Sequence, residues 1–323
     1  MTGRRFWFEA VLLCLFAVSP LTGSHGQAGN YPSGPVKIIS QQAPGGGADV
    51  AIRLVTEGLS KRWGKQAVLV DMPGAGGLIA ARAAASAPPD GMTLFMALAS
   101  AFVVLPQTHA RLPFDIDDFV PVGFVGEVPM GVAVSPALPV KSLPELIALS
   151  KRTPGGLTAA VSFRGSLPNL TTELFRIRSG ADITSVYYPG SAQAMSDVTS
   201  GRVPVLIDGL GGPAAAGGLK LLAIASPNRL ASHSDVPTVA ETVPGFAASG
   251  WFVLVAPHGT PVWIVDKLNR DLRAVLAEPY VSKRFAALST SSRPLSPKEV
   301  GDFIRSEQQL WKPVVRRLNF LTP

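Results

Sequence analysis

Cysteine is nearly absent from the sequence, and this excludes functions that depend on a thiol or a disulfide. Cys14 is the only cysteine among 323 residues, and it lies inside an apolar N-terminal stretch. Leu13 stands before it, where a lipid-anchor signal would need a small residue. Once that stretch is removed the chain has no thiol, which excludes disulfide bonds and thiolate chemistry. An exported protein without disulfides suits a bacterial periplasm.

The N-terminal stretch has the order of a secretory signal peptide. Arg4 and Arg5 precede an apolar run from 11 to 18, and small and polar residues follow from 22 to 29. We therefore expect residues 1–28 to be cleaved on export. Long apolar runs are also missing: this one is too short for a membrane span, and later runs contain charge or proline. The sequence predicts a soluble, monomeric protein of the periplasm.

Charge of either sign is sparse, and catalytic signatures are missing. Charged residues make up 16% of the chain and hydrophobic residues 47%, which permits a large core and disfavours general disorder. The net charge of +7 is spread singly, without the basic blocks of nucleic-acid binders. His109, His233 and His258 lack zinc-ligand spacing. Neither Ser166 nor Ser191 stands in a nucleophile elbow, and no glycine loop precedes a Walker A lysine. We expect no cofactor, metal or nucleic acid.

What the sequence does have is a triple-glycine loop, Pro44–Asp49. It follows an apolar run at 36–39 and precedes a run of helical spacing that reaches Trp63. Glycine lets a backbone approach a ligand without Cβ obstruction, and the first turn of a helix offers unpaired N–H groups to an anion. The alternative is a turn that only joins two elements. The loop alone does not decide between them.

The strand–loop–helix pattern recurs along the chain. We expect strands at 36–39, 67–70, 93–99, 157–162, 183–188, 203–208, 219–225 and 251–256. We expect helices at 52–63, 78–87, 143–150, 169–178, after 192, at 266–276 and at 300–310. Such alternation implies parallel strands with right-handed crossovers and so an α/β fold. The glycine-rich segment 120–134 is expected to form two short strands with a bend, and 213–218 to be a mobile connection.

Several short motifs occur in an order and spacing that mark one family. They are Pro44–Asp49, Pro73–Gly77, Pro89–Leu94, Pro189–Ala192, Asp235–Thr238 and Ala256–Pro261. In these motifs the chain resembles the periplasmic solute receptors of tripartite tricarboxylate transporters, also called Bug-type receptors, from about Tyr31 onward. The resemblance implies a two-domain α/β fold of the type II periplasmic-binding-protein (Venus-flytrap) kind, with a ligand cleft between the domains. It places domain 1 at 29–127 plus 249–323 and domain 2 at 128–248.

The resemblance also implies a binding site in which glycine loops hold a ligand carboxylate through backbone groups and water. The candidate ligand-binding residues are Gln42, Gly46, Gly47, Ala48, Asp49, Ser100, Arg164, Gly165, Ser166, Gly190, Ser191, Ala192 and Asp208. Ser191 is expected to cap its helix and to donate its hydroxyl to the ligand. Arg164 either pairs with a second ligand carboxylate or points outward into water.

The chain departs from the family pattern at three places near this site. Gln41 and Gln42 stand where proline and an aromatic residue are usual, which predicts a more polar cleft floor. Phe163 and Arg164 stand where small residues and asparagine are common. Pro189 replaces a usual lysine or arginine and so removes a positive charge. These departures leave the identity of the ligand open.

A receptor without catalysis is the function favoured by the sequence. It would capture a di- or tricarboxylate, an acidic amino acid or an aromatic acid, and deliver it to an integral membrane transporter. One alternative is a ligand-loaded sensor that docks to a membrane signalling protein. Another is an enzyme acting on a carboxylate, with Asp49 or Asp208 as base, although an aspartate in the first turn of a helix more often serves that helix.

Overall fold

The computed structural model describes residues 31–109, 111–211 and 217–317. The expected signal peptide and most of the segment 213–218 lie outside these residues. From Pro32 onward the chain forms one compact unit, and the description below concerns that unit.

The first lobe is built on the predicted βαβαβ alternation. Its elements are β1 (Val36–Ser40), α1 (Gly47–Trp63), β2 (Ala67–Asp71), α2 (Leu78–Ala85) and β3 (Thr93–Leu98). β1 pairs in parallel with both β2 and β3, as the alternation predicts. Ile52, Val55 and Leu59 of α1 are fully buried, so the apolar stripe read from the sequence is the face that packs on the sheet.

The second lobe repeats the same construction. Its elements are α4 (Leu143–Arg152), β5 (Leu157–Val161), α5 (Leu167–Ser179), β6 (Ile183–Tyr187), α6 (Ser191–Thr199), β7 (Val205–Gly209) and β8 (Lys220–Ile224). β5 lies between β6 and β7 and is parallel to both. The Ser142 hydroxyl accepts a hydrogen bond from Glu145 N at 3.4 Å and so caps α4. Each lobe therefore has three parallel strands with helices between them, and the expectation of parallel strands is wrong for β8 and for β9 (Ser249–Pro257), which pair antiparallel with their neighbours.

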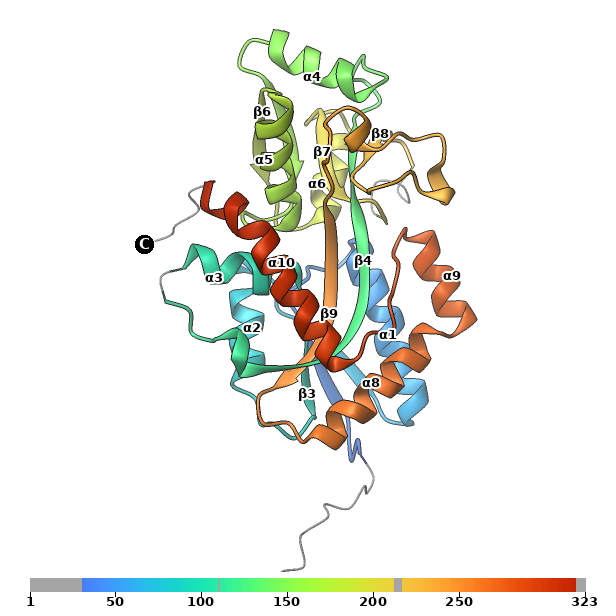
Figure 1. Ribbon diagram of the computed structural model, residues 1–323. Coiled ribbons are helices and arrows are strands. Elements are labelled where there is room, and N and C mark those ends of the chain that lie inside the picture. The colour runs from blue at the N-terminus through green and yellow to red at the C-terminus, as the bar shows by residue number, and fades with distance from the viewer. Residues whose placement is uncertain (1–30, 110, 212–216, 318–323) are drawn as a thin grey trace, which may run out of the picture. The chain divides into compact units, whose positions relative to one another are not determined.

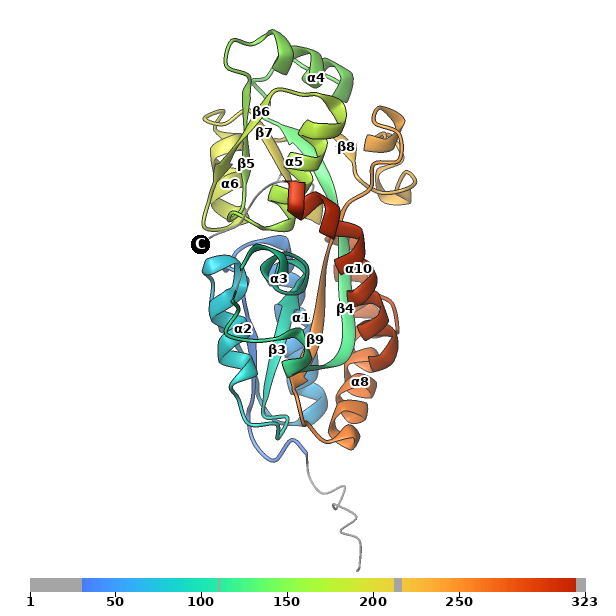
Figure 2. The same cartoon turned by 60° about the vertical axis from the view of Figure 1, so that its left-hand side comes forward.

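Two long strands, β4 (Phe119–Val134) and β9 (Ser249–Pro257), run from one lobe into the other (Figures 1 and 2). From Phe119 to Pro129, β4 pairs with β9 in the sheet of the first lobe. From Met130 onward it pairs with β7 and β8 in the sheet of the second lobe. The strand order is β2-β1-β3-β9-β4-β7-β5-β6, with β8 also on β4. One hydrogen-bonded ladder thus joins the two lobes.

The expected break into two short strands at 120–134 is wrong, because the structure has one strand of 16 residues. Its glycines accommodate bends without ending the ladder. The register with β9 shifts between Pro121 and Gly123 and between Phe124 and Gly126. A Cβ added at Gly126 would lie 2.8 Å from Thr290, so the glycine permits a close approach there.

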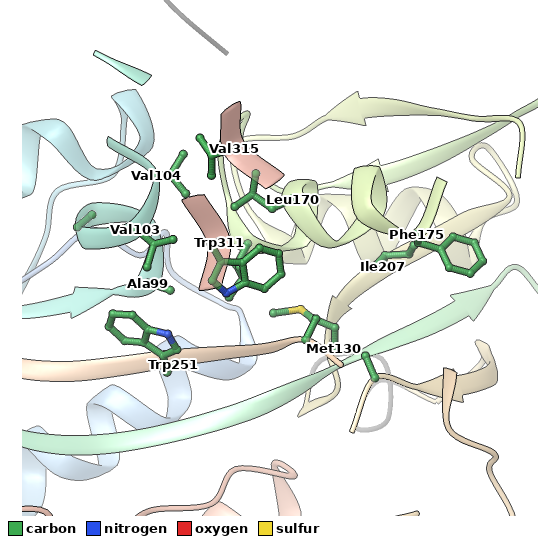
Figure 3. Packing of buried hydrophobic residues seen from close by; sticks show 14 of the residues in the cluster. Ala99, Val103, Val104, Met130, Leu170, Phe175, Ile207, Trp251, Trp311 and Val315 are labelled. Atoms are coloured by element: carbon green, nitrogen blue, oxygen red, sulfur yellow. The ribbon is translucent and has the colours of Figure 1, made fainter. Parts of the chain in front are cut away.

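Three C-terminal helices complete the unit: α8 (Val262–Leu276), α9 (Pro279–Ala287) and α10 (Pro297–Arg317). The sequence did not predict α9, and it predicted α10 at half its length because Pro313, which lies inside the helix, reads as a stop signal. α10 packs on β4 of the first lobe and reaches α5 of the second. Figure 3 shows Trp311 and Val315 of α10 near Leu170 of α5.

Candidate functional site

A pocket lies between the lobes and encloses a cavity of about 90 Å³. Residues from both lobes line it, together with Val128, Met130 and Trp251 of the two connecting strands. Seven of the predicted site residues are in the lining: Gln42, Gly47, Ala48, Ser100, Ser166, Ser191 and Asp208. The structure therefore brings together segments that are up to 166 positions apart in sequence, counted from Gln42 to Asp208.

Two helices begin at the pocket without a side-chain cap. α1 begins at Gly47 after Gly46, and α6 begins at Ser191 after Gly190, and neither glycine can supply a capping oxygen. The first-turn N–H groups of a helix need acceptors, and the positive end of the helix dipole favours an anionic one. Gly47, Ala48 and Ser191 all line the pocket. Two uncapped helix N-termini, one from each lobe, thus face the same cavity.

A third helix, α5, begins at the pocket but is capped. The hydroxyl of Ser166 accepts a hydrogen bond from Asn169 N at 3.2 Å. The side chain of Asn169 in turn accepts from Gly165 N at 3.0 Å, which fixes the preceding turn. Ser166, Leu167 and Pro168 line the pocket as a shaped wall. Gly165, which was expected to bind the ligand, shapes this turn and is not in the lining.

Three predicted residues, Gly46, Gly190 and Ala192, lie where the two glycine loops come into contact. A Cβ added at Gly46 would lie 3.6 Å from the Cβ of Ser191, and one at Gly190 would lie 3.0 Å from the Cβ of Ala43. A Cβ added at Gly45 would lie 3.5 Å from that of Ala192. Gly46, Gly190 and Ala192 therefore form a rim where the lobes touch, beside the pocket and not in its lining.

Asp49 supports the first glycine loop from behind. Its carboxylate accepts a hydrogen bond from Gly45 N at 3.0 Å and pairs with Arg53 at 2.9 Å. Arg53 also reaches Asp71 at 2.7 Å. Asp49 is buried and absent from the pocket lining. Its geometry assigns it to holding the loop, and gives no support to the expected ligand contact or to a role as base.

The floor of the pocket is polar, and the two glutamines have different places in it. Gln41 is fully buried, and its amide Nε2 donates to Ser100 Oγ at 2.7 Å, while its Oε1 accepts from Leu98 N at 3.3 Å. Gln42 lines the pocket itself. Ser100 opens a π-helical turn, Ser100–Val104, which leads into the short helix α3 (Leu105–Thr108). π-helical turns often occur at functional sites, and no motif in the sequence indicates this one.

Asp208 stands at the end of β7 and is 7% exposed. Its Oδ1 accepts a hydrogen bond from Gly209 N at 2.7 Å, while Oδ2 has no hydrogen-bond partner among the described residues. Burial raises the pKa of the Asp208 carboxyl. The Ser191 hydroxyl and the Gly209 N–H oppose this rise, because they favour the charged form.

The expectation that Ser191 caps its helix is wrong. Ser191 is the first residue of α6, and its hydroxyl lies beside Asp208.

Apart from Asp208, the lining contains no charged or titratable side chain within the described ranges. Most of it is apolar, including Phe163, Leu98, Trp251 and Phe252, with Leu288 from the turn after α9. Figure 3 shows Trp251 close to Ala99, another lining residue. An anion in this pocket would therefore be held by backbone N–H groups and hydroxyls of the described lining. The described residues contain no group of three potential metal ligands.

Arg164 is exposed and is not in the lining, which favours its outward, solvated alternative. We expect Arg164→Ala to change the affinity for a dicarboxylate and for its matched monocarboxylate by less than about fivefold, since exposed charges contribute under about 1 kcal/mol. Isothermal titration calorimetry with succinate and butyrate measures both. A selective loss of succinate binding would place Arg164 at the ligand.

None of the helices in the described part of the chain is both long enough and apolar enough to span a membrane.

Comparison with known proteins finds a matching family and similar relatives. Residues 51–320 match the sequence profile of the family described as tripartite tricarboxylate transporter family receptor. The protein BugT of Bordetella pertussis is 37% identical over 297 residues, which cover 90% of each chain.

Solved structures agree with the fold. R. palustris Rpa4515, determined with adipate, superposes with a TM-score of 0.85 at 32% identity and covers 88% of this chain and 97% of its own. The periplasmic binding protein BugD gives 0.85 at 26% identity, covering 91% and 100%. MatC of Rhodopseudomonas palustris, with bound malate, gives 0.81 at 29% identity, covering 88% and 100%. The chain thus has the two-domain architecture of periplasmic binding proteins.

Proposed function

Since this chain belongs to the tripartite tricarboxylate transporter family of receptors, we propose that it captures a small organic carboxylate and delivers it to an integral membrane transporter. The observation that carries the proposal is the pair of uncapped helix N-termini, at Gly47 and Ser191, that face one cavity from opposite lobes. Such ends bind carboxylates through their N–H groups. A cavity with no cationic side chain in its described lining can still attract an anion in this way.

The ligand would be clamped between two domains, 29–127 plus 249–323 and 128–248. Two observations support these boundaries. β4 exchanges its partner β9 for β7 and β8 at Pro129 and Met130. The chain returns at β9, which begins at Ser249. Bending of β4 and β9 between the sheets would let the lobes part and admit the ligand.

Linear dicarboxylates are the first ligands to test. Rpa4515 was determined with adipate and MatC with malate, and both are about 30% identical to this chain.

We place the protein in the periplasm, because BugD is a periplasmic binding protein and residues 1–28 have the order of a signal peptide. Transport is favoured over sensing by the family of the chain, and a catalytic role is disfavoured by a described lining whose single titratable group is Asp208.

The proposal is tested by a thermal-shift panel of malate, succinate, adipate, citrate, glutamate and benzoate, with neutral sugars and alkylammonium ions as controls. A ligand at 100 times its Kd adds about 2.7 kcal/mol to the free energy of unfolding, which raises Tm by several degrees. We expect such a shift with at least one carboxylate and with none of the controls. A shift with sugars or cations alone would contradict an anion site.

A further inference from the structure

A site for an anion does not explain why an acidic side chain, Asp208, lies in the pocket. The Asp208 carboxyl is more than nine-tenths buried and lines the cavity. Its neighbour Ser191 is the first residue of α6, so Asp208 lies next to one of the two helix N-termini proposed to hold the ligand carboxylate. Two carboxylates this close would repel one another if both were ionised.

The hydrogen bonds of Asp208 indicate which oxygen would carry a proton. Oδ1 accepts the Gly209 N–H at 2.7 Å, so a lone pair of this oxygen is already used. Oδ2 has no partner among the described residues. In a neutral carboxyl the acidic hydrogen therefore belongs on Oδ2, which forms no hydrogen bond with a described residue, although the Ser191 hydroxyl is close enough to act on the carboxyl. A ligand oxygen in the cavity can accept this hydrogen and so satisfy a buried polar group.

No charged group among the described residues acts on Asp208. Burial raises the pKa of its carboxyl, the Ser191 hydroxyl and the Gly209 N–H oppose this change, and no charged side chain of the described ranges contributes to it. The charged side chains of the elements around it are bound elsewhere: Glu127 to Arg293, Glu173 to Arg176, Asp197 to Arg202, Asp49 to Arg53, and Arg178 to the carbonyl oxygens of Pro244 and Gly245. Nothing charged is therefore in place to keep Asp208 ionised.

We propose that Asp208 binds the ligand in its neutral form and donates its Oδ2 hydrogen to an oxygen of the ligand carboxylate. The proton stays between the two carboxyl groups, with no bond to carbon made or broken. Capture of the anion is then coupled to uptake of one proton wherever the empty site is ionised. This inference rests on the proposed carboxylate-binding function.

The sign of the resulting pH dependence is fixed by linkage. Burial holds the pKa of Asp208 above its ordinary value, so below that raised pKa the site is already neutral and affinity is at its plateau. Above it each binding event must first take a proton from solution, and the Kd rises about tenfold per pH unit. Ordinary anion binding by N–H groups has no such slope once the ligand is fully ionised.

The test uses the full mature protein with malate and adipate as probes. Calorimetry in two buffers of different ionisation enthalpy, from about pH 6 to about pH 8.5, measures the protons taken up and the Kd. We expect uptake that approaches one proton at the alkaline end, together with weakening affinity. Asp208→Asn keeps both the acceptor and the donor but cannot titrate, so it should take up no proton and bind with a Kd that changes less than about threefold over this range.

Two further variants separate the possibilities. Asp182→Asn removes an exposed acid of the same lobe that is not in the pocket lining, and it should behave as the unaltered protein does. Asp208→Leu removes the donor, and it should bind weakly at every pH. Binding without proton uptake, or a slope that Asp208→Asn retains, would overturn the inference and leave the receptor function standing. Failure of the unaltered protein to bind any carboxylate would overturn both.

A measurement without ligand checks the neutral state itself. A folded-state pKa above the unfolded value means that the folded protein is stabilised below the unfolded pKa and loses that stabilisation as pH rises through the folded pKa. Asp208→Asn lacks this loss. Its denaturation midpoint in urea should therefore move above that of the unaltered protein as pH rises, and the gap should close in acid. Parallel curves at all pH values would overturn the inference.

Discussion

Replacing Gly46 by valine should lower the affinity for a carboxylate ligand about a hundredfold while the protein still folds. A Cβ at this position already lies 3.3 Å from Gln42 Nε2 and 3.6 Å from the Cβ of Ser191. The two γ-methyl groups of valine need space that these neighbours occupy. The lobes must then part at the rim, which costs about 1–3 kcal/mol of overpacking and weakens the charged hydrogen bonds at the start of α1 by a similar amount.

Folding should survive because Gly46 has a φ of −85° and a ψ of 165°, values that valine adopts without strain. Gly46→Ala is the matched control, since its Cβ makes tight contacts but adds nothing beyond them. It should lose less than about tenfold in affinity. Calorimetry on both variants, with circular dichroism as a check on the fold, measures the difference. Equal affinity in Gly46→Val and the unaltered protein would remove the rim contact from the binding mechanism.

Phe102→Ala should lower the free energy of unfolding by about 3–5 kcal/mol. Phe102 is 1% exposed and lies on the π-helical turn that begins at Ser100. Its ring meets Phe95 at 6.3 Å and Phe119 at 5.6 Å, measured between centroids. Removing the ring takes these contacts away and leaves a cavity that rigid neighbours cannot fill.

Urea denaturation measures this loss of stability. The matched control is Tyr280→Ala, because Tyr280 is an aromatic residue with 63% of its surface exposed. That change should stay within about 0.5 kcal/mol. A loss below about 1 kcal/mol in Phe102→Ala would mean that the turn is not packed as described.

Local patterns in the sequence predicted most of the fold. The apolar stripe of α1 depends on residues three or four positions apart, and these residues face the same side of the helix in the folded protein. β4 was misread because its glycines and prolines were taken as breaks. These residues bend the strand without ending it, because β9 pairs with β4 on either side of each bend. The sequence of β4 alone does not show that such a partner strand exists.

The candidate site was predicted only in part, because its lining also depends on segments that are distant in the sequence. Loops at strand ends were found, but whether a loop residue faces the cavity or the opposite loop depends on how the lobes close. Gly46 and Gly190 are rim residues for this reason. Trp251 and Leu288 line the pocket from distant segments that have no motif. The spacing of Asp49 and Arg53 could have indicated the structural role of Asp49. Opposite charges four positions apart on a helix commonly form an ion pair, and these two residues do so.

Trp251 connects the pocket to the far end of the chain. One part of its side chain lines the cavity, while its indole N–H donates to Glu307 Oε2 of α10 at 2.8 Å. The same carboxylate oxygen accepts the indole N–H of Trp311 at 3.3 Å. Indole emission responds to the polarity and the hydrogen bonding around the ring. A ligand that enters the cavity and changes the polarity around Trp251 should therefore change the fluorescence of an indole that α10 holds in place.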